Sequence, residues 1–302
     1  MTHAHDPKKT GVAYGIAAYA AWGVAPVYFK AVAHVPPLEV LAHRIVWSIV
    51  LLVLLIFLRR QWSTIATVAR KSATMLTLCV TTILIAVNWF AFIWAVAHDQ
   101  VLQASLGYFI NPLVNVLLGY MFLRERLRPR QIGSVALASV GVLTLTLSYG
   151  HVPWLALTLA GSFAFYGLLR KTANVEALVG LTIETSILAP VALGYLIYVG
   201  AKGEGTFRAE SIQVDVLLMA AGIVTAVPLI WFTNAARRLR LATLGFLQYL
   251  APTGHFLLAV VAYHEPFTRT HLVSFSCIWA ALLIYSLDMR RALRDARPSL
   301  PE

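Results

Sequence analysis

Apolar residues fall into long blocks along this chain, and short polar connections separate the blocks. Hydropathy places the blocks at about 11–31, 38–58, 73–96, 101–123, 130–148, 151–171, 178–200, 212–236, 241–263 and 268–288. A helix of about 20 apolar residues is long enough to cross the hydrocarbon core of a bilayer. The pattern therefore predicts an all-α integral membrane protein with ten transmembrane helices.

The connection at 61–72 has a different pattern. Trp62, Ile65 and Ala69 fall on one face if this segment is helical. A short amphipathic helix lies along the membrane surface rather than across it. We therefore expect a short interfacial helix before the third span.

The composition of the chain limits the kinds of molecule that can surround it or bind to it. The chain is 59% hydrophobic and only 12% charged, whereas about a quarter of the residues in a soluble domain are charged. The net charge of +11 raises the question of nucleic acid, but the sequence has no basic stripe interleaved with exposed aromatic residues. We predict that the lipid bilayer surrounds the protein and that it binds no nucleic acid.

The basic residues predict the orientation. Of the 24 Lys and Arg residues, 19 lie in connections on one side of the predicted spans and 4 on the other, and Arg44 lies inside a span. Positive charge concentrates on the cytoplasmic side of membrane proteins. We therefore predict cytoplasmic tails at 1–10 and 289–302. The first apolar run is longer than the core of a signal peptide, so we expect an uncleaved first span.

The second half of the chain repeats features of the first. Pro112 aligns with Pro252 at an offset of 140 residues, and other anchors align at offsets of 138 to 141. Each half then holds five spans, and an odd number of spans inserts the second copy upside down. We predict two inverted five-helix repeats, at 11–148 and 151–288. This arrangement is typical of secondary transporters that bind substrate where the halves meet, while gene duplication without such a role is the alternative.

Several long motifs are specific enough to compare with known families. They are YFK at 28–30, AHR at 42–44, NWFAFIWAV at 88–96, SLGYFINPLVNVLLGYMFLRERL at 105–127, YGLLRK at 166–171 and GFLQYLAPTGHFLLAVVAYHEPF at 245–267. Together they resemble the RarD, or chloramphenicol-sensitivity, branch of the drug/metabolite transporter superfamily. The resemblance covers about 11–288. It implies two EamA-type repeats in the inner membrane and a permease or exporter role for small molecules. His98 and Asp99 depart from the branch, which is more often neutral there.

Polar side chains inside the predicted spans are candidate functional residues, because they are costly in hydrocarbon. Glu39 and His43 lie one helical turn apart and can form an ion pair or share a proton, which makes Glu39 a coupling or gating candidate. His43 and Arg44 are candidates for substrate binding. Arg44 can bind a substrate carboxylate with two nitrogens, or it can pair with Glu184 or another acid inside the bundle. The alternative is that Arg44 extends to the outer interface.

Two predicted spans carry an amide close to a proline. Asn111 precedes Pro112 in the fourth span, and Gln248 precedes Pro252 in the ninth. A proline inside a helix breaks a backbone hydrogen bond and frees a carbonyl. We expect these amides to line the substrate site, in preference to interhelical hydrogen bonds alone. The further candidates for the lining of the same site are Asn88, Trp89, Tyr108 and Tyr249. For the aromatic residues of span three, ordinary packing is the favoured interpretation.

Charged residues near the ends of spans divide into two groups. Lys30 and Lys171 end the first and sixth spans at opposite faces, where anchoring and gating are alternative roles. Anchoring explains Lys171 better than Lys30, which lies on the side with few positive charges. Glu184 lies well inside the seventh span and is the candidate for proton coupling. We expect Glu125 and Glu265, at mirrored span ends, to form interfacial salt bridges.

The sequence excludes several kinds of chemistry. It has no GxxxxGK[ST] loop for an ATP-driven pump and no HExxH or HxxxH metal-binding pattern. We predict no cofactor, no metal and no catalytic residue. The predicted function is a secondary transporter of small metabolites or drugs that works by alternating access. A membrane-embedded enzyme and a non-transporting sensor remain alternatives. The sequence predicts neither the substrate, the coupling ion, the direction nor the oligomeric state.

Overall fold

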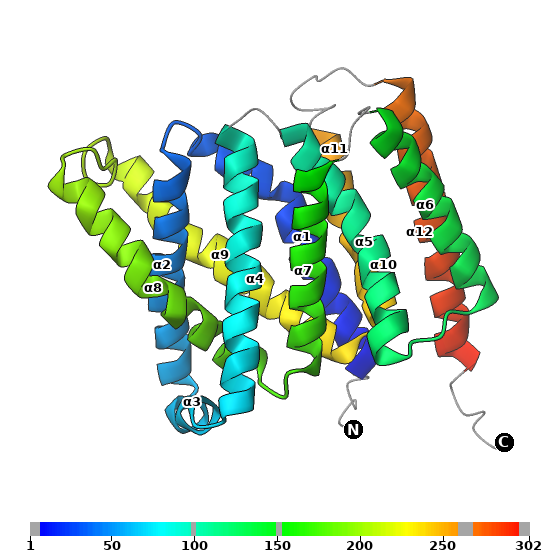
Figure 1. Ribbon diagram of the computed structural model, residues 1–302, viewed down its shortest axis with the longest axis horizontal. Helices are drawn as coiled ribbons and strands as arrows, with labels where there is room; N and C mark the ends of the chain where they lie inside the picture. Colours follow the sequence, from blue (N-terminus) through cyan, green and yellow to red (C-terminus); the bar gives the residue numbers. More distant parts are fainter. Residues whose placement is uncertain (1–6, 98–100, 149–152, 259–267, 296–302) are drawn as a thin grey trace, which may run out of the picture.

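The computed structural model describes residues 7–97, 101–148, 153–258 and 268–295, and every regular element in these ranges is a helix (Figure 1). The helices are α1 (Pro7–Ala31), α2 (Pro37–Leu58), α3 (Trp62–Ala69), α4 (Ser72–Ala97), α5 (Val101–Leu123), α6 (Pro129–Ser148), α7 (Trp154–Thr172), α8 (Ala177–Ala201), α9 (Ile212–Arg238), α10 (Leu241–Gln248), α11 (Leu250–Leu257) and α12 (Arg269–Asp295). The predicted all-α fold is confirmed.

Among the described residues, 8 helices are long and apolar enough to cross a membrane, namely α1, α2, α4, α5, α6, α8, α9 and α12. The two other predicted spans fall on α7 and on the pair α10 and α11. Helix α7 carries Arg170 and Lys171 in its last turn, and α10 and α11 have 8 residues each. A multi-span membrane protein is therefore confirmed, and the count of ten spans stays a prediction.

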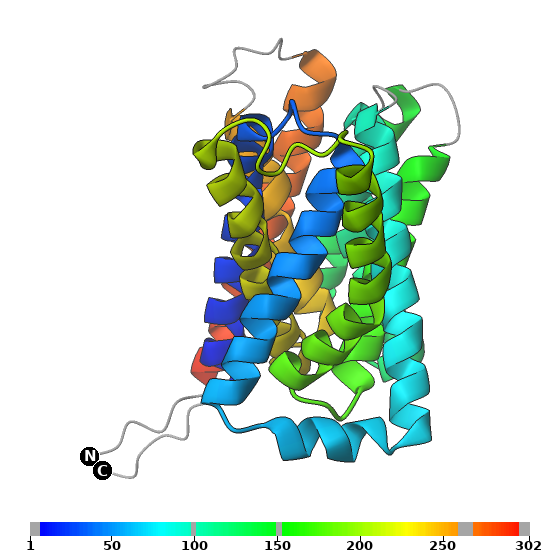
Figure 2. The same cartoon turned by 90° about the vertical axis from the view of Figure 1, so that its left-hand side faces the viewer.

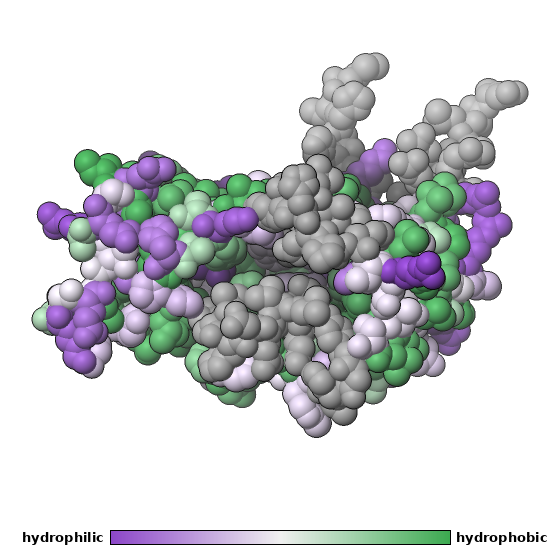
Figure 3. Space-filling view, turned by 90° about the horizontal axis from the view of Figure 1, so that it is seen from above, coloured by the Kyte–Doolittle hydropathy of each residue, from purple (hydrophilic) through white to green (hydrophobic). Residues whose placement is uncertain are grey.

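The outside of the bundle is apolar. Leu147, Val191 and Leu76 expose 77%, 74% and 67% of their surface. Exposed apolar patches of this extent would favour aggregation in water, whereas lipid chains solvate them. Seen from above, hydrophilic residues gather at both ends of the face, and one group lies over the connection between α8 and α9 (Figure 3). The apolar side of the bundle is thus its lipid-facing surface.

The start of α1 and the end of α12 lie at the same end of the bundle, and α3 lies across that end (Figures 1 and 2). We call this the inner end, because the predicted cytoplasmic connections lie there, and the opposite end the outer end. The short helix predicted at 61–72 is therefore present, as α3. Its Val68 is 8% exposed and Ile65 packs on the core, while Trp62 is 48% exposed.

The equivalent prolines Pro112 and Pro252 have different effects. Helix α5 continues through Pro112, whereas the ninth predicted span is divided at Tyr249 into α10 and α11. Pro252 cannot donate to the carbonyl of Gln248, four residues earlier, and its ring crowds that carbonyl. Helix α10 ends at Gln248, which is consistent with the loss of this hydrogen bond, whereas α5 tolerates the same loss at Pro112.

Most pairs of closely packed helices among the described residues have an equivalent pair when the two halves are exchanged, although the pair α7–α9 has none. Helix α1 packs on α9, as its equivalent α7 packs on α4, and α2 packs on α9 as α8 packs on α4. Likewise α5 packs on α7, as α10 and α11 pack on α1. The pairs α2–α8, α5–α10 and α6–α12 join equivalent helices. Two inverted repeats would produce this symmetry, and the predicted repeats at 11–148 and 151–288 stay a prediction.

Candidate functional site

Arg44 lies between four helices, where two aromatic rings enclose its guanidinium group. Its Nε donates to Thr225 Oγ1 of α9 at 2.9 Å. Its Cζ lies 5.3 Å from the ring centroid of Phe29 on α1 and 5.3 Å from that of Trp89 on α4. Both distances are typical of cation–π contacts. The side chain of Arg44 is thus fixed by residues from three other helices.

The depth of Arg44 follows from the start of α2. Pro36 and Pro37 begin this helix, a position that suits proline because the first N–H groups need no intrahelical partner. Arg44 is seven residues further, about 10 Å from the outer end at 1.5 Å per residue. Its partner Thr225 lies in the middle of α9. The guanidinium therefore points into the bundle and does not extend to the outer interface.

Two further aromatic residues complete this site. Tyr108 of α5 lies within electrostatic range of Arg44. The ring of Phe92 lies within contact distance of both Tyr108 and Phe29. Its centroid is 6.3 Å from that of Tyr108 and 6.4 Å from that of Phe29. We call Phe29, Arg44, Trp89, Tyr108 and Thr225 the Arg44 cluster. It unites three of the predicted site residues, namely Arg44, Trp89 and Tyr108.

No carboxylate among the described residues forms an ion pair with Arg44. The predicted alternative of a pair with Glu184 is wrong, because Glu184 pairs with Arg170 instead. The Nη atoms of Arg44 donate no hydrogen bond within the described part of the chain. A guanidinium group with these atoms available can hold a carboxylate with two parallel hydrogen bonds. The aromatic rings offer apolar contacts beside it.

The predicted amides form a hydrogen-bonded chain between helices. Asn111 Nδ2 donates to Ala160 O of α7 at 2.6 Å, and Asn115 Nδ2 donates to Asn111 Oδ1 at 2.9 Å and to Gln248 Oε1 at 3.4 Å. Asn111, Asn115 and Gln248 are at most 3% exposed. These bonds join α5, α7 and α10, so they match the alternative of interhelical hydrogen bonding. Asn115 was missed, although it lies one turn after Asn111 on the same face.

Asn88 and Tyr249 also have interhelical partners. Asn88 Nδ2 donates to Leu159 O at 2.9 Å and to Ser162 Oγ at 3.0 Å, which joins α4 to α7. The hydroxyl of Tyr249 donates to Phe109 O of α5 at 3.4 Å. Their assignment as substrate-lining residues stays a prediction, and each already serves as a link between helices.

Glu184 belongs to a buried network in the inner half. Its Oε1 lies 3.7 Å from Arg170 Nε, and the two side chains are 2% and 0% exposed. Thr81 Oγ1 donates to Glu184 Oε1 at 2.5 Å and the Tyr166 hydroxyl to Glu184 Oε2 at 3.3 Å. Gly180 makes room for the pair, since a Cβ there would lie 2.0 Å from Arg170 Nη1. The network ties α4, α7 and α8 together.

Arg44 and Glu184 occupy equivalent positions in the two halves, because they are separated by the same offset of 140 residues as Pro112 and Pro252. Each is the eighth residue of its helix. At 1.5 Å per residue, Arg44 lies about 10 Å from the outer end and Glu184 about 10 Å from the inner end. The two halves thus place opposite charges at mirrored depths. Aligning the two halves of the sequence residue by residue would have shown that Arg44 and Glu184 are equivalent positions.

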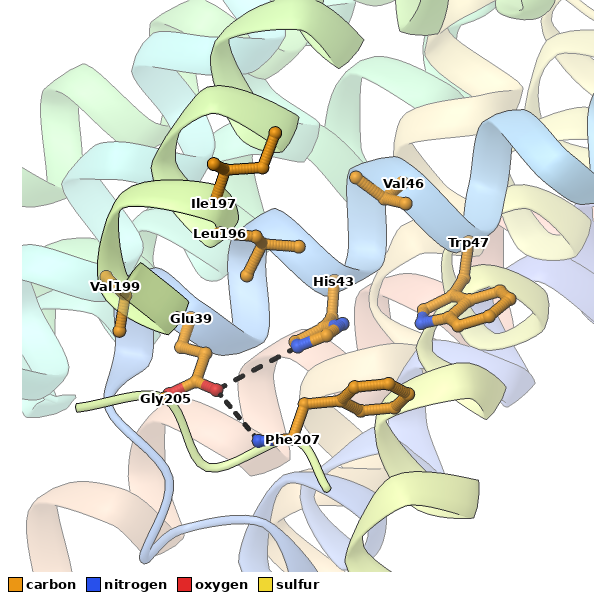
Figure 4. A pocket seen from close by; sticks show the side chains of 10 residues that line it. Glu39, His43, Val46, Trp47, Leu196, Ile197, Val199, Gly205 and Phe207 are labelled. Carbon is orange, nitrogen blue, oxygen red and sulfur yellow. Dashed lines mark hydrogen bonds and ion pairs between the residues drawn. The ribbon is translucent and has the colours of Figure 1, made fainter. Parts of the chain in front are cut away.

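Glu39 holds the loop between α8 and α9 (Figure 4). Its Oε1 accepts from Thr206 N at 2.7 Å and Phe207 N at 3.3 Å, and its Oε2 accepts from Thr206 Oγ1 at 2.9 Å. The predicted pairing with His43 is present as a contact of 3.9 Å between His43 Nε2 and Glu39 Oε1. The carboxylate is therefore mainly engaged with the loop.

The two gating lysines lie at opposite ends of the bundle. Lys171 Nζ donates to Ala236 O at 3.1 Å and also to Leu239 O, at the carbonyl end of α9. A cation there satisfies terminal carbonyls and complements the helix dipole. Lys30 is exposed at the outer end of α1. A structural role thus accounts for Lys171, and gating by Lys30 stays a prediction.

The carboxylate of Glu125 binds the first backbone N–H groups of α10. It accepts from Leu241 N at 2.9 Å and from Ala242 N at 3.3 Å, and it lies 3.8 Å from Arg240 Nε. The structural role expected for it is confirmed. The remaining predicted positions, Glu265, His98 and Asp99, lie outside the described residues. Within the ranges that the structure covers, no three His, Cys, Asp or Glu residues are grouped as a metal site requires.

The described helices form a multi-span membrane bundle, and the family comparison identifies its class as a membrane transporter. Residues 9–147 match the EamA-like transporter family. The match ends almost where the first predicted repeat ends. A solved structure aligns with a TM-score of 0.71 and 19% identity, covering 94% of this chain and 99% of that one. The similarity to this solved structure is evidence for the fold alone.

Curated relatives define the branch. Protein RarD of Escherichia coli (strain K12) is 48% identical over 285 residues, which are 94% of this chain and 96% of that protein. An uncharacterized transporter of Vibrio cholerae serotype O1 is 47% identical over 297 residues, which are 98% of each chain. Protein RarD of Streptomyces exfoliatus is 42% identical over 297 residues, which are 98% of this chain and 94% of that protein. The chain belongs to the RarD branch of the drug/metabolite transporter superfamily.

Proposed function

We propose that the protein is a secondary transporter that exports small organic anions or zwitterions across the inner membrane, and that Arg44 binds their anionic group. The observation that carries this proposal is a guanidinium group that has no carboxylate partner among the described residues. A charge inside a membrane protein is costly unless a partner or a wet cavity compensates it. A substrate carboxylate supplies that partner during transport.

The aromatic residues of the Arg44 cluster support a substrate with an apolar part. Phe29 and Trp89 lie against the guanidinium group, so a carboxylate held by Arg44 lies beside their rings. Cation–π contacts stabilise the charge by about 0.5–2 kcal/mol while the site is empty. Small amino acids and organic acids with an apolar side chain have this combination of features.

Alternating access is supported by the exchange symmetry of the helix packing. In this structure, Glu184 and Arg170 form a buried pair in the inner half. We propose that this network separates when the transporter opens inward. Glu184 then meets the inner solution and can take up a proton, which would couple the proton gradient to substrate movement. Glu39 is a weaker coupling candidate, because three donors of the α8–α9 loop already occupy its oxygens.

Flux in proteoliposomes tests the proposal. The panel contains labelled amino acids, small organic acids and chloramphenicol, with and without an imposed proton gradient. Chloramphenicol is included because a relative of 35% identity in Pseudomonas aeruginosa is named chloramphenicol-sensitive protein RarD. We expect saturable flux of an anionic or zwitterionic compound. We also expect Arg44→Gln to reduce this flux about tenfold or more, because it removes a charged hydrogen-bonding partner, and Arg44→Lys to retain part of it.

Each outcome has a defined meaning. Normal flux in Arg44→Gln would remove Arg44 from the site, and transport of neutral compounds alone would contradict the substrate class. The absence of flux by the folded protein would favour the sensor. The enzyme alternative would rely on Glu39 and His43, and the engagement of Glu39 with Thr206 leaves that pair little room for acid–base work.

A further inference from the structure

A cavity lies between the outer ends of α2 and α8 and beneath the α8–α9 loop, apart from the Arg44 cluster. Its volume is about 310 Å³, near the lower end of the range of small-molecule pockets, about 300–1,000 Å³. Glu39, His43 and Trp47 of α2 form its polar wall, with Phe207 of the loop opposite (Figure 4). It shares no residue with the Arg44 cluster.

In the part of the chain that the structure describes, two polar side chains of this wall, His43 and Trp47, have ring nitrogens without a hydrogen-bond partner. The side chain of His43 is 5% exposed, and neither ring nitrogen is hydrogen-bonded within the described residues. Its Nε2 lies 3.9 Å from Glu39 Oε1, which is beyond hydrogen-bond distance. The indole Nε1 of Trp47 is also buried without a partner, and it lies on the side of its ring that faces His43 in Figure 4.

These unsatisfied groups need an acceptor that the described chain does not supply. A buried donor without a partner costs about 1–3 kcal/mol, and few occur in native proteins. Glu39 does not satisfy these donors in the structure, because its Oε1 lies 3.9 Å from His43 Nε2 and Trp47 Nε1 has no partner among the described residues. Its carboxylate is held instead by the backbone N–H groups of Thr206 and Phe207. An oxygen atom of a bound molecule between His43 and Trp47 would satisfy both.

The other residues that line the cavity determine which further groups a ligand can carry. Val46, Leu196 and Ile197 are apolar and face the same space, so they favour an apolar chain or ring. The Glu39 carboxylate in the wall disfavours an anion. Ile197 is also 62% exposed on the lipid-facing surface of α8, which places one edge of the cavity beside the outer leaflet.

We propose that this cavity is a binding site for a small neutral amphiphile with a hydroxyl or carbonyl oxygen, which enters from the outer leaflet. The oxygen accepts from Trp47 Nε1 and from the protonated nitrogen of neutral His43. The apolar part contacts Leu196 and Ile197. The ester region of a membrane lipid and a neutral drug dissolved in the membrane both have this chemistry. The site does not depend on the transport function proposed for Arg44.

Photolabelling of the purified full-length protein tests the site. The probe is a 1-octanol analogue that carries a diazirine in its chain, and labelled peptides are mapped by mass spectrometry. We expect saturable labelling of segments 39–47 and 196–207 above that of the lipid-facing surfaces of α6 and α7, and competition by unlabelled 1-octanol. Labelling no stronger than on those surfaces would mean that water alone fills the cavity, and the proposal would be wrong.

Variants separate the site from general lipid exposure. Trp47→Phe keeps the ring but removes the N–H donor, so we expect labelling to fall several-fold. Trp154→Phe is the matched control, because Trp154 is 73% exposed on α7, and it should change nothing. Ile197→Trp fills the cavity from the lipid side and serves as a second variant. Undiminished labelling in both Trp47→Phe and Ile197→Trp would overturn the proposal.

Competition identifies the source of the ligand. Phosphatidylethanolamine in mixed micelles competes if a lipid occupies the site, and chloramphenicol competes if a neutral drug does. Either result supports the site and names its occupant, whereas failure of 1-octanol itself to compete contradicts it. The readout is labelling rather than flux, so its failure and the failure of the transport proposal are distinguished.

Discussion

A guanidinium group without a carboxylate partner is costly in an apolar bundle, and the surroundings of Arg44 reduce that cost without removing it. Thr225 takes one hydrogen bond, and the rings of Phe29 and Trp89 contact the charge. The sequence pointed to Arg44 because it is the one Arg inside a predicted span away from its ends. It did not show the rings, because Phe29, Trp89 and Thr225 come from three other helices whose packing is a tertiary property.

A prediction about a second single residue concerns Asn111. Asn111→Ala removes its bonds to Ala160 and Asn115, so we expect the free energy of unfolding to fall by about 1–3 kcal/mol, as for other buried hydrogen bonds. Thermal unfolding in detergent measures this. Thr144→Ala is the control, because Thr144 bonds only within its own helix. Unchanged stability together with lost flux would instead place Asn111 in the substrate site.

Charged residues at the level of helices act mainly as connectors. Lys171 binds the carbonyl end of α9, Glu125 begins α10, and Glu39 holds the α8–α9 loop. The sequence placed each near a span end, which is a local property. It did not show that each binds a different helix or loop, because those partners are 65 to 167 residues away. The helices were therefore predictable from the sequence, whereas the groups that the charged residues at their ends bind were not.

The pair of Glu184 and Arg170 allows a double-mutant test. Glu184→Gln alone leaves Arg170 buried without a counter-charge, and we expect a loss of about 3–5 kcal/mol in stability. Arg170→Met in the same protein removes that charge, so Glu184→Gln/Arg170→Met should regain much of the loss. Thermal unfolding of the two single variants and the double variant gives the coupling energy. Additive effects would show that the two side chains do not interact.

Glu184 has a second consequence, in transport. If it carries the coupling proton, Glu184→Gln should flatten the dependence of flux on inner pH, measured in the Arg170→Met background so that stability is not limiting. Wild type is the reference, because Arg170→Met alone would leave Glu184 buried without its counter-charge. A pH profile identical in wild type and in Glu184→Gln/Arg170→Met would eliminate Glu184 as the coupling acid.

The loop between α8 and α9 gives a further prediction. Glu39→Ala removes the acceptor of two backbone N–H groups, at Thr206 and Phe207. We expect both amides to exchange hydrogen faster by about tenfold or more, since each loses a charge-assisted bond. Hydrogen–deuterium exchange measures this. Glu204→Ala, an exposed change in the same loop, is the control, and equal exchange in the two variants would show that Glu39 does not hold the loop.

The molecule as a whole shows what the sequence predicts well. Long apolar blocks predicted most helix bounds within a few residues, because hydrophobic length is a local signal. The end of the tenth span is the exception, since α12 continues past 288 to Asp295. The division of the ninth span at Tyr249 follows from Pro252, yet Pro112 leaves α5 continuous, so proline alone did not distinguish a break from a continuous helix. The packing pairs that survive exchange of the halves agree with the repeat found by sequence offset.

Orientation is testable at this scale. In a protein whose Cys79 and Cys277 are replaced by Ala, Glu204→Cys lies between α8 and α9, and Asn174→Cys lies between α7 and α8; both positions are exposed. An impermeant maleimide should label Glu204→Cys in intact cells and Asn174→Cys only after permeabilisation. Labelling of Asn174→Cys in intact cells would show that α7 does not cross the membrane as predicted, and would reduce the count of ten spans.

The central claim is that Arg44 holds the anionic group of the substrate, and equilibrium binding tests it most directly. The measurement compares the affinity of the purified protein for a transported carboxylate and for its neutral amide, in wild type and in Arg44→Gln. We expect wild type to prefer the carboxylate by about tenfold or more, as a charged hydrogen-bonded contact implies, and Arg44→Gln to lose this preference. An equal preference in both proteins would contradict the account.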